Sequence, residues 1–379
     1  MDTKSVGLYI HIPFCKAKCH YCDFNSCAGT ESSIPDYFNA LKSEMQLYTS
    51  ELSDYNVNTI FIGGGTPSYV EPHNIYEVLN LCGRCFSIDS KAEITMEANP
   101  GTLSYEKLVS YRVSGINRLS IGLQAWQNKH LSALGRIHRI SDFTNNFSEA
   151  RKAGFRNINV DLIFGFPGQT MGEWHETLAN TVELGMEHVS CYSLIIEEGT
   201  VFGDRFEKGS LIPLEDDTDR EMYHTAIDTL TKHGFKHYEI SNFARSGYEC
   251  RHNLIYWKTG QYIGIGAGAH SYFNGSRFNN VSGIDEYISR IAREGLHREN
   301  EQLIDADEQM KEFMMLGFRL VDGIDADEFK TRFGVDVLEV FGSQISGLEK
   351  RKLLKTENGR FKMTEAGLDL ANQVYMEFV

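Results

Sequence analysis

Six short apolar runs, each followed by a longer segment with helical spacing, constrain the fold of this chain more than any other feature. Several runs are nearly continuous in Val, Ile, Leu and Phe, which is typical of parallel strands covered on both faces. The runs are VGLYIHI (6–12), TIFIGG (59–64), EITMEA (93–98), RLSIGLQ (118–124), INVDLIFG (158–165) and HVSCYSL (188–194). Six consecutive β-then-α units predict an α/β fold with a partial (β/α)6-type barrel. In such a barrel, functional groups gather at the carboxyl ends of the strands.

Beyond residue 195 this pattern changes, and we predict three segments in the chain. Residues 1–195 form the barrel core, residues 196–300 extend the barrel, and residues 301–379 form a mostly helical, winged-helix-like domain. The last segment contains three helical stretches before GRFKMTEAGLDLANQV. That sequence is typical of a short β-turn-β wing followed by a final helix.

The composition excludes several classes of protein. A formal net charge of −15 argues against nucleic acid as a main partner, because phosphate contacts require a basic surface. The chain shows neither a signal peptide nor an apolar run of about 18 residues that would predict a transmembrane segment. Eight cysteines in 379 residues are too few for a disulfide scaffold. We therefore expect a cytoplasmic protein whose cysteines are thiols or metal ligands.

Three of these cysteines follow the first apolar run, with the spacing Cys15-x3-Cys19-x2-Cys22. A structural zinc site normally takes four ligands, and catalytic zinc more often takes histidine or carboxylate. Iron–sulfur clusters prefer thiolates, and a [4Fe–4S] cluster held by three cysteines keeps one iron open for a small molecule. The alternative is a group of buried or zinc-binding thiols. The spacing favours the cluster.

Polar and glycine residues recur at or near the ends of the later predicted strands. The sequence GGGTP (63–67) allows backbone N–H groups to approach a carboxylate or phosphate, although glycines alone also make tight turns. Glu97, Gln124, Arg136 and Asp161 follow in successive β/α units. A carboxylate can accept hydrogen bonds from a ribose diol or an amine, and arginine can hold a carboxylate. Their ordered recurrence predicts one shared site.

These motifs resemble those of known proteins. Cys-x3-Cys-x2-Cys after a first strand resembles the signature of the radical S-adenosyl-L-methionine (SAM) superfamily. The order HIPFC, CHYCDF, GGGTP, EANP, SIGLQ, DLIFGFPGQT and MLGFRL covers nearly the whole chain. It is similar to the family that contains oxygen-independent coproporphyrinogen III oxidase and related haem (heme) chaperones. The resemblance implies a radical SAM barrel that carries a [4Fe–4S] cluster on Cys15, Cys19 and Cys22.

The same resemblance implies which residues contact SAM. It implies that a first SAM contacts Tyr9, Gly64 and Glu97. A second SAM is expected to contact Tyr21, Gly65, Thr66, Gln124, Arg136 and Asp161, and Ile195 is expected to line the adenine pocket. Whether SAM is cleaved or only bound stays open.

Two departures from the oxidase pattern favour the chaperone branch. The oxidase has a further cysteine where this chain has Phe24, and it begins with an extension before its first strand, which here starts near residue 6. The sequence HNLIYW (252–257) matches the HNxxYW signature of the chaperones. Imidazole is a good axial ligand of haem iron, so this match implies haem binding through His252, with Cys250 as a second candidate. A lone histidine without the match is more often a core or surface residue.

The resemblance therefore implies a haem chaperone that delivers haem to apo-haemoproteins such as respiratory enzymes. A homodimer and peripheral membrane association are further expectations from the family. The alternative function is oxidative decarboxylation of coproporphyrinogen III through a 5′-deoxyadenosyl radical.

Overall fold

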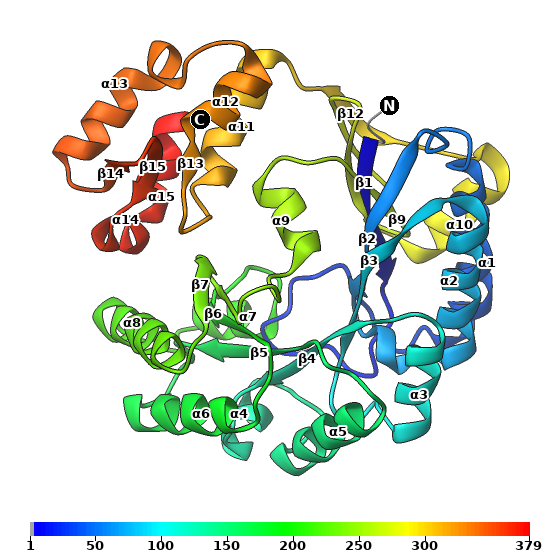
Figure 1. The fold of residues 1–379 in the computed structure, drawn as a ribbon. Coiled ribbons are helices and arrows are strands. Elements are labelled where there is room, and N and C mark those ends of the chain that lie inside the picture. The colour runs from blue at the N-terminus through cyan, green and yellow to red at the C-terminus, as the bar shows by residue number, and fades with distance from the viewer. Residues whose placement is uncertain (1–3) are drawn as a thin grey trace.

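The computed structural model describes residues 4–379 and contains a curved sheet of 12 strands (Figure 1). Six neighbouring strands lie parallel and in sequence order, which confirms the predicted barrel. They are β1 (Lys4–Ile12), β2 (Tyr55–Gly64), β3 (Ser87–Ala98), β4 (Arg118–Gln124), β5 (Ile158–Phe164) and β6 (His188–Ser193).

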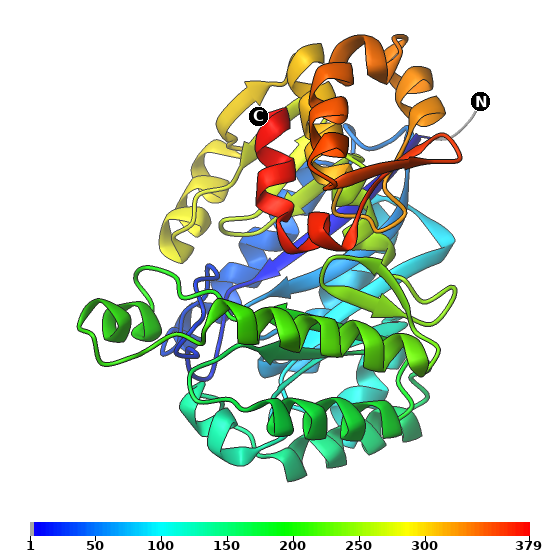
Figure 2. The same ribbon diagram turned by 90° about the vertical axis from the view of Figure 1, so that its left-hand side faces the viewer.

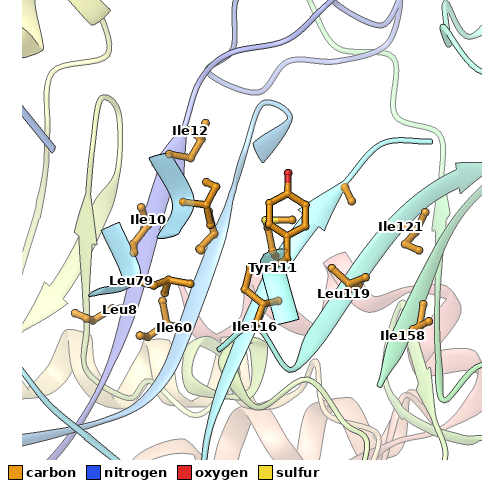
Figure 3. Close-up of a cluster of buried hydrophobic side chains, with 14 of the residues drawn as sticks. Leu8, Ile10, Ile12, Ile60, Leu79, Tyr111, Ile116, Leu119, Ile121 and Ile158 are labelled. Carbon is orange, nitrogen blue, oxygen red and sulfur yellow. The ribbon is translucent and has the colours of Figure 1, made fainter. Parts of the chain in front are cut away.

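Helices cover the outer face of this sheet (Figure 1). They are α1 (Ile34–Leu47), α2 (Pro72–Cys85), α3 (Tyr105–Val113), α4 (Asn128–Ala133), α5 (Ile140–Lys152), α6 (Met171–Glu183) and α8 (Asp216–Lys232). Alternate strand residues such as Leu8 and Ile60, which are paired across β1 and β2, face these helices in a buried cluster with Leu79 of α2 (Figure 3). Burying each such side chain contributes about 1.5–3 kcal/mol, and Ile60→Ala should cost about 2–5 kcal/mol.

The other alternate residues point into the barrel, where the environment is aromatic and polar. The Tyr9 ring of β1 stacks on the Phe61 ring of β2, with a centroid separation of 6.2 Å. Because strand side chains alternate with a period of two, the same strands supply both the outer hydrophobic core and an inner layer available for binding.

Residues after the sixth strand extend the sheet at both edges. One edge gains β8 (Asn242–Ala244), which lies antiparallel to β6, and then β7 (Lys236–Glu239), which lies antiparallel to β8. The other edge gains β9 (Tyr262–Ile265), parallel to β1, and then β10 (His270–Phe273), β11 (Ser276–Asn279) and β12 (Glu299–Leu303). The short helix α9 (Arg251–Trp257) connects the two edges and lies in the opening between β7 and β1 (Figure 1). Helix α7 (Val201–Glu207) projects from the body near the loop that follows β1, and α10 (Ile284–Glu294) packs on α1 (Figure 2).

The C-terminal region has its own hydrophobic core and is mostly helical, as predicted. It contains α11 (Ala306–Gly317), β13 (Ile324–Asp325), α12 (Ala326–Phe333), α13 (Val337–Lys350), β14 (Leu354–Glu357), β15 (Arg360–Met363), α14 (Glu365–Asp369) and α15 (Ala371–Tyr375). Asp305, Asp325 and Asp336 begin the three longer helices by accepting backbone N–H groups of the first turn. The predicted wing is present as β14 and β15, and β13 adds a third strand that the sequence did not indicate.

Main-chain hydrogen bonds join this region to the barrel. Ile240 N–H donates to the Arg319 carbonyl at 3.1 Å, and Val321 N–H donates to the Tyr238 carbonyl at 3.1 Å. Within residues 4–379, no helix combines the length and the apolar character needed to cross a bilayer.

Candidate functional site

The cysteine-bearing loop leaves the carboxyl end of β1 and folds back against itself. Cys15 N–H donates to the Cys27 carbonyl at 2.8 Å, and Cys27 N–H donates to the Pro13 carbonyl at 2.9 Å. All eight cysteines of the chain are free thiols. The fold of the loop brings Cys15, Cys19 and Cys22 to the wall of one cavity.

This cavity has a volume of about 450 Å³ and lies at the carboxyl ends of the parallel strands, as expected for such a barrel. Its volume is in the range of sites that enclose small organic ligands. Every predicted site residue lines it except Tyr9, Cys250 and His252: Cys15, Cys19, Tyr21, Cys22, Gly64, Gly65, Thr66, Glu97, Gln124, Arg136, Asp161 and Ile195. The exposed side chains of Phe24 (65%) and Ile195 (68%) add an apolar lining.

The glycines of GGGTP bring β2 into close contact with the cysteine loop. Gly64 has a φ of +111°, and a Cβ there would lie 2.4 Å from the His11 ring. A Cβ on Gly65 would lie 2.8 Å from the backbone carbon of Pro13. A larger residue at Gly65 would therefore displace the start of the loop that carries the cysteines, and one at Gly64 would displace the His11 ring of β1.

The backbone N–H groups of this turn have partners inside the protein. Gly64 N–H donates to Glu97 Oε2 at 3.1 Å, Gly65 N–H to the Ile12 carbonyl at 2.8 Å, and Thr66 N–H to the Phe14 carbonyl at 2.9 Å. These three donors hold the turn against its neighbours, so they are not free to bind the carboxylate that the sequence suggested. The turn therefore shapes the wall of the cavity, and the charges that act on a bound ligand come from charged side chains.

Glu97 is the side chain most affected by its surroundings in the cavity. Burial raises the pKa of the Glu97 carboxyl from 4.5 to about 7, with a further contribution from the negative charge of Asp161. The Gly64 N–H bond acts in the opposite direction. A carboxyl with this pKa beside a second acid is suited to receive a cationic group, which would stabilise its ionised form.

Asp161 is held in place by hydrogen bonds from the barrel interior. Ser120 Oγ donates to Oδ2 at 2.9 Å, and Asn159 Nδ2 donates to Oδ1 at 2.7 Å. Behind Asn159, His188 Nδ1 lies 2.6 Å from Asn159 Oδ1, and His188 Nε2 lies 2.8 Å from the Tyr238 hydroxyl. Since burial lowers the pKa of His188 well below 6.5, this ring is neutral and donates toward Asn159. The donors of this chain therefore point toward the Asp161 carboxylate.

Arg136 connects the cysteines to the strand ends. Its guanidinium donates to Cys19 Sγ at 3.5 Å and to the Gly122 carbonyl at 2.9 Å, and it also contacts Asn99 Oδ1. The buried Arg136 Nε has no hydrogen-bond partner in the described residues. Gln124 has a φ of +69°, which is unusual for a residue other than glycine and typical of functional sites.

The site fits the cofactors that the motifs imply. No group of three or more His, Cys, Asp or Glu residues in the described chain (4–379) is placed to hold one metal ion. A [4Fe–4S] cluster does not require such a group, because each cysteine ligates a different iron. The cavity is lined by three free cysteines, two carboxylates and a guanidinium, and this set of groups suits a cluster with a zwitterionic, diol-bearing ligand such as SAM.

His252 lies on α9, outside this cavity and inside the barrel opening. Its Nδ1 is 2.7 Å from Thr59 Oγ1, and its Nε2 is 2.8 Å from the Tyr256 hydroxyl. The ring stacks on Phe61 at a centroid distance of 5.2 Å, and the residue is 1% exposed. Burial lowers the pKa of His252 to about 3, so the imidazole is neutral at physiological pH. In this conformation both ring nitrogens are occupied by hydrogen bonds.

Two other predicted residues also lie outside the cavity. The Tyr9 hydroxyl donates to His11 Nδ1 at 3.0 Å, and its ring centroid is 6.5 Å from that of His252. Tyr9 thus belongs to the aromatic layer below the cavity. Cys250 is buried at the start of α9, with its Sγ 3.7 Å from Glu93 Oε1.

Sequence reasoning missed several lining residues, among them Asn99, Ser120 and Tyr192. Asn99 Nδ2 donates to Thr66 Oγ1 at 2.9 Å, so it links the glycine turn to Arg136. Its position two residues after Glu97, in EANP, is the one signal that could have identified it. Ser120 and Tyr192 lie within apolar strands and carry no such signal.

Comparison with known proteins identifies families and relatives that this chain resembles. Residues 9–180 match the radical SAM superfamily, and residues 304–370 match the HemN C-terminal domain. The heme chaperone HemW of Bacillus subtilis (strain 168) is 38% identical over 372 residues, which covers 98% of each chain. This chain belongs to the HemW family. The HemW of Escherichia coli (strain K12) is 37% identical over 334 residues, covering 86% of this chain and 85% of that protein.

The fold of this HemW family member is also that of a solved enzyme structure. The coproporphyrinogen III oxidase HemN of Escherichia coli, a radical SAM enzyme, superposes with a TM-score of 0.87. The alignment covers 99% of this chain and 90% of that chain at 21% sequence identity. The predicted radical SAM fold and the predicted family resemblance are therefore confirmed.

Proposed function

We propose that this protein is a haem chaperone that binds haem and delivers it to apo-haemoproteins such as respiratory enzymes. The observation that carries the proposal is the similarity, over 98% of both chains, to a protein named heme chaperone HemW. The presence of HNLIYW on α9, inside the barrel opening, agrees with it. We propose a cytoplasmic location, with a homodimer and peripheral membrane association as further properties to be tested.

In this proposal the large cavity holds a [4Fe–4S] cluster on Cys15, Cys19 and Cys22, with SAM beside it. A bound cluster would supply one-electron reduction and an open iron. The Arg136 guanidinium, 3.5 Å from Cys19 Sγ, offsets the negative charge of the thiolates. Glu97 accepts a cationic group of the first SAM, and Asp161, oriented by Ser120 and Asn159, accepts hydrogen bonds from the ribose hydroxyls of the second.

His252 is the proposed axial ligand of haem iron. Its low pKa keeps the imidazole neutral, which is the form that ligates iron. Iron ligation requires that one of its two hydrogen bonds, to Thr59 or Tyr256, is exchanged for the metal. The conformation described here is therefore a closed one, and haem binding requires α9 to move.

Two measurements test the proposal: haem transfer and porphyrin conversion. Both are made in parallel after anaerobic reconstitution of the cluster. The haem-loaded protein should transfer its haem to an apo-haemoprotein, as followed by the change in the Soret spectrum. Coproporphyrinogen III should remain unconverted in the presence of SAM and a reductant. Conversion without haem uptake would replace this proposal with the oxidase alternative.

A further inference from the structure

The helix that carries His252 is anchored at both ends by charged side chains from different parts of the protein. At its start, Glu93 of β3 accepts hydrogen bonds from the N–H groups of Arg251 and His252, both at 3.2 Å. At its end, Arg332 of α12 donates to the carbonyls of Lys258 at 3.0 Å and Thr259 at 2.9 Å. These are the terminal groups that a helix leaves without internal partners.

The C-terminal region makes a second contact with the end of α9. The Arg319 guanidinium lies 4.2 Å from the centroid of the Trp257 ring, and one of its NH2 groups is 3.6 Å from Glu239. This contact leaves polar atoms unsatisfied, because Trp257 Nε1, Arg319 Nε and Glu239 Oε2 are buried without hydrogen-bond partners. Unsatisfied buried groups carry a free-energy penalty, so this side of α9 is held less firmly than the Glu93 side.

The backbone on both sides of α9 can change direction. Gly247, with a φ of +84°, precedes the helix, and Gly260 follows it directly after Thr259, which has a φ of +47°. Glycine tolerates many backbone conformations, and hinges are usually a few such residues at the ends of an element. A helix of seven residues lies between these positions, and the strands on its two sides, β8 and β9, pair with β6 and β1 and not with the helix.

We infer that the C-terminal region is a latch that holds α9 closed, and that release of Arg332 and Arg319 exposes His252 to haem iron. The inference rests on the proposed haem ligation by His252 and adds its regulation. Haem binds only the fraction of molecules in which α9 is released, so the apparent affinity and association rate scale with that fraction. Arg332 and Arg319 are positioning residues, since they act on His252 through α9.

The test compares Arg332→Ala with wild-type protein by two independent measurements. Amide hydrogen exchange without haem reports the release of α9 at Leu254 and Lys258, whose N–H groups donate within the helix. Loss of two partly exposed hydrogen bonds should accelerate exchange there about tenfold. The association rate of haem, measured by stopped-flow absorbance at the Soret band, should rise by about the same factor.

Two further variants separate this effect from general destabilisation. Arg332→Lys keeps the charge but loses the forked geometry, so intermediate values are expected. Arg351→Ala removes an arginine that bonds Glu377 and Gln373 inside the C-terminal region, so it should change neither measurement. Circular dichroism of all variants confirms the native fold before exchange is measured.

The possible results distinguish the latch from the proposed function. Unchanged exchange at Leu254 and Lys258 in Arg332→Ala would refute the latch. Faster exchange with an unchanged haem association rate would refute release of α9 as the route to His252. If exchange becomes faster while neither wild type nor variant takes up haem, the proposed function fails and the regulation inferred from it is overturned as well.

Discussion

Replacing Glu97 with glutamine should stabilise the cofactor-free protein at high pH and leave its stability unchanged at low pH. The Glu97 carboxyl has a pKa of about 7 in the folded protein and 4.5 as its ordinary value. Below pH 4.5 the group is protonated in both folded and unfolded chains, so it contributes no pH dependence. As the pH rises from 4.5 to 7, the unfolded chain ionises first, which lowers the free energy of unfolding. Above pH 7 the free energy of unfolding decreases no further through this group.

The magnitude follows from the difference between the two pKa values. Each unit of pKa difference corresponds to about 1.4 kcal/mol, so the ionised Glu97 lowers the free energy of unfolding by about 3 kcal/mol when the effect is complete. Solvent that enters the cavity screens part of it, so we expect about 2 kcal/mol. Glutamine keeps an oxygen that can accept the Gly64 N–H bond, so Glu97→Gln removes the charge with little other change.

Thermal unfolding of the cofactor-free protein at pH 4.5 and pH 8 measures this effect. Glu97→Gln should raise Tm by roughly 2–3 °C relative to wild type at pH 8 and by less than about 1 °C at pH 4.5. The exposed Glu183, at the end of α6, provides the control, and Glu183→Gln should leave Tm unchanged at both values. A Glu97→Gln variant that is no more stable than wild type at pH 8 would refute the reasoning about this carboxyl.

Three further predictions concern the cavity. Replacing Cys15, Cys19 and Cys22 together with alanine should abolish the broad absorbance near ~400 nm after anaerobic reconstitution; retention of about four irons per chain would contradict the cluster assignment. Asp161→Ala should weaken SAM binding about tenfold by calorimetry, because a partly buried acceptor is lost; an unchanged Kd would show that the SAM site is misplaced. Gly65→Val should reduce cluster assembly by displacing the backbone of Pro13; iron content equal to wild type would show that this close contact is not required.

The sequence was sufficient to predict the barrel and most of the cavity because both follow from local patterns. The apolar runs predicted the six parallel strands β1 to β6, and residues placed at their carboxyl ends meet at one edge of a parallel sheet. Glu97 and Asp161 could therefore be placed in the same site without knowledge of their contacts.

The contacts of His252 could not be predicted in this way, because they depend on residues far apart in the chain. Its partner Thr59 is 193 positions away, and its helix is held by Glu93 and Arg332 from two different regions. Nor did the glycine turn reveal that its N–H groups already have partners. These features arise from tertiary packing, which single-residue patterns do not encode.

The central claim, haem binding through His252, is tested most directly by haem titration of wild-type protein and His252→Ala after anaerobic reconstitution. Wild type should bind haem with a defined Soret band and leave coproporphyrinogen III unconverted. His252→Ala should bind haem on the order of 10–100-fold more weakly, the scale known for perturbed metal shells, while its cluster absorbance stays intact. Equal affinity and an identical Soret band in both proteins would contradict ligation by His252.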